Sequence, residues 1–382
     1  MRSKTNADEL NMLAQQLFDK ICISQKNINL LENYYEEAKD YNTEYKPCRK
    51  NSSIDADIAN HINFFTNYIK KICFEYKNII FNINIYTKNY EDLSNHIYLI
   101  KMAIVCCLYD KKGFKDKVSL KIDLYLTALE KTLPLVPGTP IKKQHAKSGY
   151  SVFSDNIYIC IYRKEEWFKY MIQELFFAFT IDLEDDKINF RNILSNSFRI
   201  DDPFLIGNSI VEFCARLFNV AVFLYFDKNV KELDSFKKEF RKMTHKEQMF
   251  SVSQAHKILS HFGLKYQDIL HKEQEINPEK NPEKNQLQLS QEKYKDEGDL
   301  FCYYITTSLL FIHQTRMIQW FNFEQNNFFN IKKSERELVI FCHYIAHCSK
   351  DDITIKTFEK KEAKQSTESN TSNNIRSCYH RI

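Results

Sequence analysis

The stretch NIYICIYRKEEWFKYMIQELFF, residues Asn156–Phe177, decides the fold. Its first seven residues, Asn156–Tyr162, are rich in Ile and Tyr, which is typical of a β-strand. Over Lys164–Thr180 apolar side chains recur at helical spacing, so a helix follows the strand almost directly. A strand that leads straight into a helix indicates a layered core in which the helix packs on a sheet.

Two further segments predict strands of the same sheet. Ile79–Tyr86 alternates apolar and polar residues, and Leu120–Thr127 does so again, so each presents one apolar face. From Asp202 onward the apolar spacing is that of helices. We therefore predict an α+β protein in which a small mixed sheet packs on the helix Lys164–Thr180, with a largely helical C-terminal subdomain.

Polar and apolar segments divide the chain into a core and flanking parts. Within the core, Ile54–Phe74 has helical spacing and is predicted to be a helical stretch. Two polar segments, one with a tandem NPEK, contain too few apolar residues to fold and are predicted to be disordered. The predicted parts are an N-terminal helical segment (1–50), an α+β core (51–200), a helical subdomain (201–273 and 296–349), a disordered linker (274–295) and a disordered tail (350–382).

The composition is that of a soluble globular protein, with 43% hydrophobic and 27% charged residues in a chain of 382. The net charge of +4 is too balanced to indicate a nucleic acid or a membrane as partner. The 11 cysteines follow no framework spacing, which favours reduced thiols and an intracellular location. The N-terminus has no apolar signal core, and the apolar run Cys302–Ile312 is too short to span a bilayer.

The centre of the decisive stretch, QELFF, has the frame of a zinc-hydrolase helix, HExxH. In that frame two histidines four residues apart lie on one helix face and bind one zinc ion, and the Glu acts on the zinc-bound water. Glu174 occupies the Glu position, but Gln173 and Phe177 stand at the two histidine positions. On these residues alone, an ordinary core helix with Glu174 at its solvent edge is favoured.

Further short stretches between Leu120 and Phe321 change this interpretation. In order they are YLTALEKTLP (125–134), KSGYS (147–151), IYICIYRKEEWFK (157–169), QELFFAFTID (173–182), EFCA (212–215), FSVSQAHKILSHFGLKY (250–266) and DLFCYYITTSLLF (299–311). Through this succession the chain resembles a family of HExxH zinc metallopeptidase-like proteins of giant (nucleocytoplasmic large) DNA viruses. The resemblance implies a zincin-like core and a location in the host cytoplasm or the virion.

The resemblance also implies roles for individual residues. Glu174 takes the position of the general base, and Glu212 takes that of the third zinc ligand. Gln173 and Phe177 replace the two histidines, which leaves one certain donor where zinc needs three. The family would bind zinc, whereas this chain is predicted to hold no cofactor and to be a catalytically inactive pseudopeptidase. A binding or scaffold role follows, with a peptide partner that could add beside the strand Asn156–Tyr162.

Two other functions stay open from the sequence. One is an active zinc metallopeptidase with non-standard ligands, for instance Glu174, Glu212 and a histidine from elsewhere. The other is a structural or virion-associated protein unrelated to zincins, in which Glu174 and Glu212 need not face one cavity. The identity of the partner and the oligomeric state do not follow from the sequence.

A buried carboxylate in a former metal site needs another cation. Arg216 lies four residues after Glu212, so the two side chains share a helix face. We therefore predict that Arg216 pairs with Glu212, with Glu174 or with both, in place of the metal.

Several histidines could suggest other sites. His343 and His347 are four residues apart and flanked by Cys342 and Cys348, but an apolar terminal helix is favoured over a metal site there. His256 and His261 are five residues apart on a helix and are predicted to be surface or cap residues. His145 and Ser148 have no acidic partner at a suitable spacing, so a catalytic triad is not expected.

Overall fold

The computed structural model describes most of the chain. The described residues are 2–28, 31, 35–40, 54–113, 116–154, 156–184, 188–230, 232–271, 293–321, 327–365 and 373–380. Nearly all of the predicted linker, residues 274–292, lies outside the described residues.

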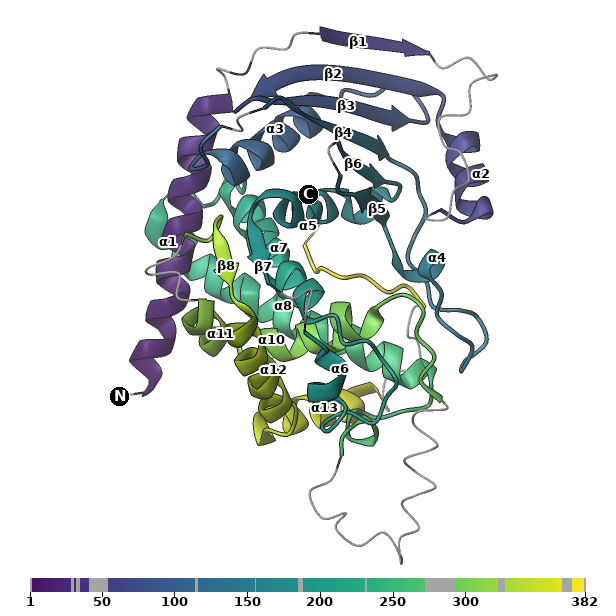
Figure 1. Ribbon diagram of the computed structural model, residues 1–382, viewed down its shortest axis with the longest axis vertical. Helices are drawn as coiled ribbons and strands as arrows, with labels where there is room; N and C mark the ends of the chain where they lie inside the picture. Colours follow the sequence, from purple (N-terminus) through teal and green to yellow (C-terminus); the bar gives the residue numbers. More distant parts are fainter. Residues whose placement is uncertain are drawn as a thin grey trace, which may run out of the picture.

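One mixed sheet of six strands forms a layer at the top of the molecule in the view of Figure 1. Its spatial order is β1-β2-β3-β4-β6-β5; β3, β4 and β6 are parallel, and the other neighbouring pairs are antiparallel. The strands are β1 (Tyr35–Asp40), β2 (Tyr68–Tyr76), β3 (Ile79–Thr87), β4 (Val118–Tyr125), β5 (Gly149–Val152) and β6 (Asn156–Ile161). The three predicted strands are confirmed as β3, β4 and β6.

The alternation that predicted these strands also sets which face of the sheet is covered. Phe81, Ile83 and Ile85 of β3 are at most 1% exposed and belong to the main hydrophobic cluster with the helices α3 (Ser94–Leu108) and α5 (Trp167–Phe179). On the opposite face, a smaller cluster of sheet residues packs against helix α2 (Ala56–Phe65). Both faces of the sheet are therefore covered, at least in part.

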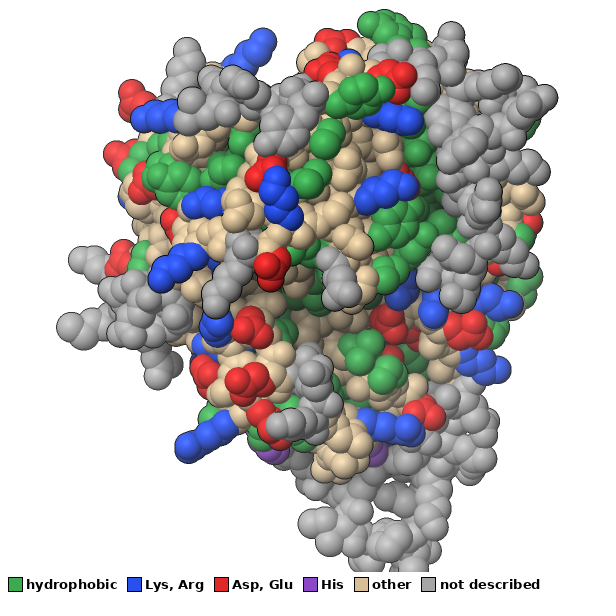
Figure 2. All heavy atoms as spheres, turned by 45° about the horizontal axis from the view of Figure 1, so that its top comes forward, with side chains coloured by type: hydrophobic (Ala, Val, Ile, Leu, Met, Phe, Trp, Pro, Cys, Tyr) green, Lys and Arg blue, Asp and Glu red, His purple; other side chains and the backbone are tan. Residues whose placement is uncertain are grey.

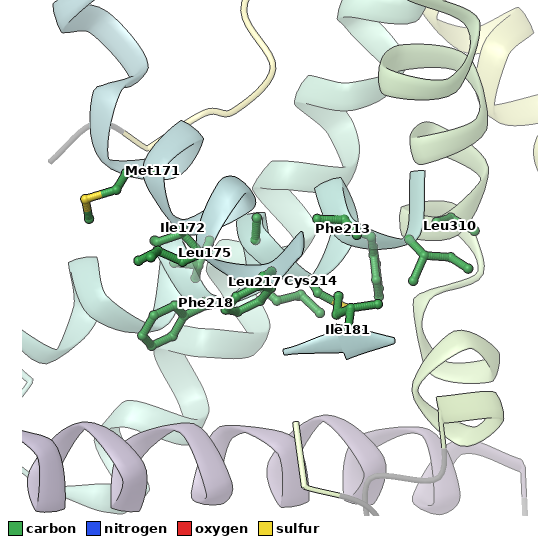
Figure 3. Packing of buried hydrophobic residues seen from close by; sticks show 14 of the residues in the cluster. Met171, Ile172, Leu175, Ile181, Phe213, Cys214, Leu217, Phe218 and Leu310 are labelled. Carbon is green, nitrogen blue, oxygen red and sulfur yellow. The ribbon is translucent and has the colours of Figure 1, made fainter. Parts of the chain in front are cut away.

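Helix α5 is the predicted helix, and it follows β6 after the single 3₁₀ turn η1 (Lys164–Glu166). It packs against helix α7 (Ile206–Tyr225) in the interior, and Figure 3 shows Ile172 and Leu175 of α5 beside Leu217 and Phe218 of α7. These side chains are 0% exposed, and burial of each is worth about 1.5–3 kcal/mol. The packing fixes α5 between the sheet and the helical part of the protein.

The helical part lies below the sheet and α5 in Figure 1, with α1 running along one side. Its elements are α1 (Arg2–Ile28), α6 (Phe190–Leu194), α7, α8 (Leu233–His261), the 3₁₀ turn η2 (Tyr266–Ile269), the π-helical turn η3 (Phe301–Thr306), α10 (Thr307–Ile312), α11 (Gln314–Phe321), α12 (Glu335–Ser349) and α13 (Asp352–Gln365). A short helix, α4 (Lys143–Ala146), precedes β5, and β7 (Ile181–Leu183) pairs in parallel with β8 (Ile331–Lys333). The protein is thus a mixed α+β structure with a helical C-terminal half, as predicted.

The predicted helical stretch Ile54–Phe74 is only half right. Helix α2 ends at Phe65, and β2 then forms an antiparallel hairpin with β3. The hairpin turns at Lys77 and Asn78, whose φ angles of 55° and 62° are those of the two central residues of a type I′ turn. A Lys-Asn pair is a weak turn signal compared with Asn-Gly, and pairing with β3 overrides the local helical pattern.

The predicted disorder of the tail 350–382 is wrong for the residues that the structure describes. Helix α13 occupies Asp352–Gln365, and the residues of 373–380 lie against the protein interior. Ile375 and Cys378 are 0% and 1% exposed. The polar composition misleads here because acceptors from distant elements satisfy the backbone of this segment.

Helix α7 is long and apolar enough to cross a membrane, judged by length and composition alone. However, 89% of its most apolar window is buried inside the protein, which is the pattern of a core helix. The cysteines of the described residues are all free thiols, and most are buried. On the surface shown in Figure 2, Lys and Arg side chains are interspersed with Asp and Glu.

Candidate functional site

A cavity of about 330 Å³ lies where the edge strand β5 meets α5 and the helical part. Its walls come from β5, α5, α7 and the start of η3, together with the loop before β5. The residues that line it include the four from the HExxH comparison, namely Gln173, Glu174, Phe177 and Glu212. Glu174 and Glu212 therefore face one cavity, although 38 positions separate them in the chain.

Glu174 lies on the side of α5 that faces the edge strand. Its carboxylate accepts a short hydrogen bond from Ser151 Oγ of β5, and the carboxylate is also hydrogen-bonded to the Tyr170 hydroxyl. Burial raises the pKa of Glu174, although these two hydrogen bonds and the charges of Lys169 and Lys147 oppose the shift. Glu174 is only 4% exposed, so it does not lie at the solvent edge expected for an ordinary core helix.

Gly149 explains how β5 comes so close to α5. A Cβ atom at this position would lie 2.1 Å from the carbonyl oxygen of Cys160 and 2.7 Å from the ring of Tyr170. The first atom is backbone and cannot move aside. Glycine is therefore required for the edge strand to pack against the helix and for Ser151 to reach Glu174.

A lysine that the sequence analysis did not single out lies at the centre of the site. Lys169 Nζ is 3.0 and 3.2 Å from the two carboxylate oxygens of Glu212 and 3.3 Å from Gln173 Oε1. The side chains of Lys169 and Glu212 are 2% and 0% exposed, and Gln173 Nε2 lies 3.4 Å from the Tyr303 hydroxyl. The ammonium group thus connects Gln173 of α5 to Glu212 of α7.

The sequence held a signal for this arrangement. Lys169 precedes Gln173 by four residues and lies in the otherwise apolar run WFKYMI, so the two side chains share the buried face of α5. A single lysine on a buried helix face needs a carboxylate partner. That partner is Glu212. The prediction assigned Arg216 to Glu212 instead, because those two residues are close in the chain.

The predicted pairing of Arg216 is wrong. Arg216 NH2 lies 2.6 Å from Glu247 Oε2 of α8, and the guanidinium is 4.5 Å from the ring centroid of Phe311. The arginine is 2% exposed, so it does not point to solvent. The Arg216 side chain extends to α8 instead of back along α7. The charge of Glu212 acts on the guanidinium only at longer range, where it helps to raise the pKa of Arg216.

Phe177 stands one helical turn after Gln173 and separates two hollows. It lines the cavity beside β5 and also a neighbouring, more open hollow of about 550 Å³ near Lys111 and Lys332. Phenylalanine offers no donor atom to a metal.

No histidine of the described residues lines this cavity. His343 and His347 of α12 are exposed, whereas Cys342 and Cys348 point into the core, so these four side chains do not converge. Among the described residues there is no group of three or more His, Cys, Asp or Glu side chains that could hold a metal ion.

His256 and His261 are both 7% exposed, which corrects their predicted place at the surface. His261 is the last residue of α8, and its Nε2 lies 2.9 Å from Thr139 O in the loop that precedes α4. This agrees with its predicted place at the end of a helix. His145 Nδ1 accepts from Lys142 N, and Ser148 lines the cavity beside β5.

No family model, no curated protein and no solved structure matches this chain. The geometry of the cavity and the residues around it therefore carry the functional argument.

Proposed function

We propose that the protein is a catalytically inactive, metallopeptidase-like protein with a zincin-like core, and that it binds an extended peptide beside β5. Glu174, Gln173, Phe177 and Glu212, to which the resemblance gives the general-base, histidine and third-ligand positions, all line one cavity. An edge strand borders that cavity, and its Ser151 contacts Glu174. This is the arrangement that the resemblance leads one to expect around a peptidase site.

The observation that carries the proposal is the position of the Lys169 ammonium. It contacts Gln173 and Glu212 at 3.0–3.3 Å, so a cation fixed by the protein lies between two of the former ligand positions. A zinc ion at this place would be repelled by the ammonium and would find Glu212 already paired. Without a bound metal, Glu174 has no activated water to serve as general base.

Strand β5 offers the edge on which a peptide can add. It pairs with β6 on one side, and within the described residues no strand pairs with its other side. Strand β6 lies between β4 and β5, so the strand Asn156–Tyr162, beside which a peptide was predicted to add, is not itself an edge. The free edge is that of β5, one strand further out.

The register shows which backbone groups a peptide would meet. Tyr162 N donates to Ser148 O at 2.9 Å, and the antiparallel pairing continues through Tyr150 and Cys160. In such a ladder alternate residues bond to the neighbouring strand, so the N–H group of Ser151 points away from β6. Phe153 is the first residue after β5, and we expect its N–H group to continue this alternation. Phe153 also lines the cavity and is 48% exposed.

The test is binding without cleavage. Random 12-residue peptides displayed on phage are selected on the immobilised protein, and one enriched peptide is synthesised and titrated by fluorescence anisotropy. We expect Phe153→Pro, which removes an outward N–H, to weaken binding about fivefold or more. The matched control Phe153→Ala keeps the N–H and should weaken binding less than Phe153→Pro does.

Mass spectrometry of the same peptide after prolonged incubation should show it intact. Cleavage of the peptide would contradict the inactive assignment. Equal binding by the proline and alanine variants would contradict strand addition.

A further inference from the structure

The segment Asn373–His380 packs into the protein with four of its eight residues buried, although it forms no helix or strand of its own. Figure 1 shows it, in yellow, between α5 and the helical part. The side chains of Ile375, Cys378 and His380 are 0%, 1% and 5% exposed. Other elements must therefore hold this segment in place.

The first clamp is the carboxylate of Glu166, at the end of η1. Ser377 N and Cys378 N donate to Glu166 Oε1 at 2.6 and 3.0 Å. Ser377 Oγ adds a third hydrogen bond, at 3.0 Å, to Glu166 Oε2. One carboxylate thus accepts two successive backbone N–H groups.

Helix α8 supplies the second clamp. Tyr379 N and His380 N donate to Glu247 Oε1 at 2.9 and 3.2 Å. One residue before the first clamp, Arg376 N donates to Gln254 Oε1 at 3.1 Å. Five consecutive backbone N–H groups are therefore accepted by side chains of other elements.

The segment also pairs with the backbone that follows β4. Ile375 N donates to Lys131 O at 2.9 Å, and Leu133 N donates to Asn373 O at 2.9 Å. These bonds, and the side-chain clamps, bind the main chain of a segment that bends at Ser377 and Tyr379. The side chains of Ile375 and Cys378 are 0% and 1% exposed, and their burial would add selectivity for side chains.

Each clamping carboxylate keeps a cation that does not belong to the segment. Lys131 Nζ is 2.6 Å from Glu166 Oε2, and Arg216 NH2 is 2.6 Å from Glu247 Oε2. Burial alone would raise the pKa of Glu166, but Lys131 and the hydrogen bonds outweigh it and hold this pKa well below its ordinary value. The charges stay compensated without the segment, so its departure leaves no unpaired buried carboxylate.

We propose that Glu166, Gln254 and Glu247 form a peptide-binding site, and that the segment 373–380 of this chain is its exchangeable ligand. Ser377 and Lys131 also line the cavity beside β5, so the bound segment closes one end of that cavity. Release of the segment would open the cavity toward α8. The inference rests on the clamps alone and holds whether or not a second peptide adds to β5.

The test uses a full chain with a protease recognition sequence inserted after Ser372. The folded protein is cut, and a fluorescein-labelled synthetic peptide of residues 373–382 is added in excess. We expect exchange, followed by fluorescence anisotropy, with a dissociation constant in the micromolar range or tighter. A chain that ends at Ser372 should bind the same peptide, and its melting temperature should rise with peptide concentration.

Two peptide variants make the test specific. N-methylation at Ser377 and Tyr379 removes one N–H from each clamp and should weaken binding at least tenfold. Replacement of the exposed Asn373 by alanine keeps every backbone bond and should leave the affinity within about twofold. If the cut protein keeps its own segment and takes up no labelled peptide, the segment is a fixed part of the core and the proposal fails. Equal binding of the N-methylated peptide would contradict backbone recognition by the two carboxylates.

Discussion

Lys169 decides the chemistry of the site at the scale of single residues. Its ammonium lies 3.0 Å from Glu212 Oε2, with both side chains buried, in a place where the resemblance would put a metal. Glu212 does pair with a buried cation, but the predicted partner was Arg216, which pairs with Glu247 instead. Spacing within one helix cannot show which of two neighbouring helices a long side chain will reach, and that is why the partner was missed.

The ion pair can be tested by double substitution. Lys169→Met leaves Glu212 buried without its cation and should destabilise the protein by about 3–5 kcal/mol in urea unfolding. Adding Glu212→Gln removes the unpaired charge and should restore most of that loss. Additive effects of the two substitutions would mean that the pair contributes nothing as a pair.

Asp202 should make the stability of the protein depend on pH, which was not predicted from the sequence. Burial raises its pKa to about 7, opposed by the hydrogen bond from Phe204 N and assisted by the neighbouring Asp296 and Asp299. From the ordinary value of 3.8 up to about 7, the unfolded chain loses this proton while the folded protein keeps it. The contribution of Asp202 to stability is therefore present at low pH and is lost as the pH rises through 7.

The Asp202→Asn variant should consequently become more stable relative to the natural protein as the pH rises. The difference in the free energy of unfolding should grow by on the order of 3 kcal/mol between pH 4 and pH 8. Urea titrations over this range measure it. Asp201→Asn is the matched control, because Asp201 is 65% exposed and pairs with Arg191 at the surface. A difference for Asp202→Asn that does not change with pH would rule out a raised pKa.

Among the elements, the sequence predicts those with strong local patterns. The strands β3, β4 and β6 and helix α5 were predicted because their apolar residues alternate or recur at helical spacing, and burial in one core rewards that pattern. Strand β5 was missed because it has only four residues and is stabilised by pairing with β6 and by close packing of Gly149 against Tyr170. Strand β2 was missed because its hairpin turn lacks a glycine.

In the candidate site, too, the residues that share one helix were predicted and the contacts between distant parts of the chain were missed. Gln173, Glu174 and Phe177 were expected to share a site because they lie on one helix, and the structure places them around one cavity with Glu212. The contacts of Glu166 and Glu247 with the segment 373–380 span more than 130 positions in the chain. No local pattern encodes such contacts, so the polar composition alone suggested disorder.

Across the whole molecule, three surfaces meet at the cavity beside β5. The sheet contributes an edge strand, α5 and α7 contribute the buried Lys169–Glu212 pair, and the segment 373–380 contributes Ser377. One hydrophobic cluster runs through α1, the sheet, α5, α7 and α8, so these surfaces are fixed relative to one another by a shared core. The arrangement provides a cavity lined by the Glu174 carboxylate and by a buried Lys169–Glu212 ion pair.

The most direct measurement of the central claim is zinc content by mass spectrometry, made on the natural protein and on two variants. Gln173→His with Phe177→His restores both histidines but keeps Lys169, and a triple variant adds Lys169→Met. We expect no stoichiometric zinc in the natural protein, weak binding in the double variant and one zinc per chain in the triple variant, because only the last frees Glu212 for the metal. One tightly held zinc in the natural protein, or a triple variant that folds and binds none, would contradict the claim that Lys169 stands in for a lost metal.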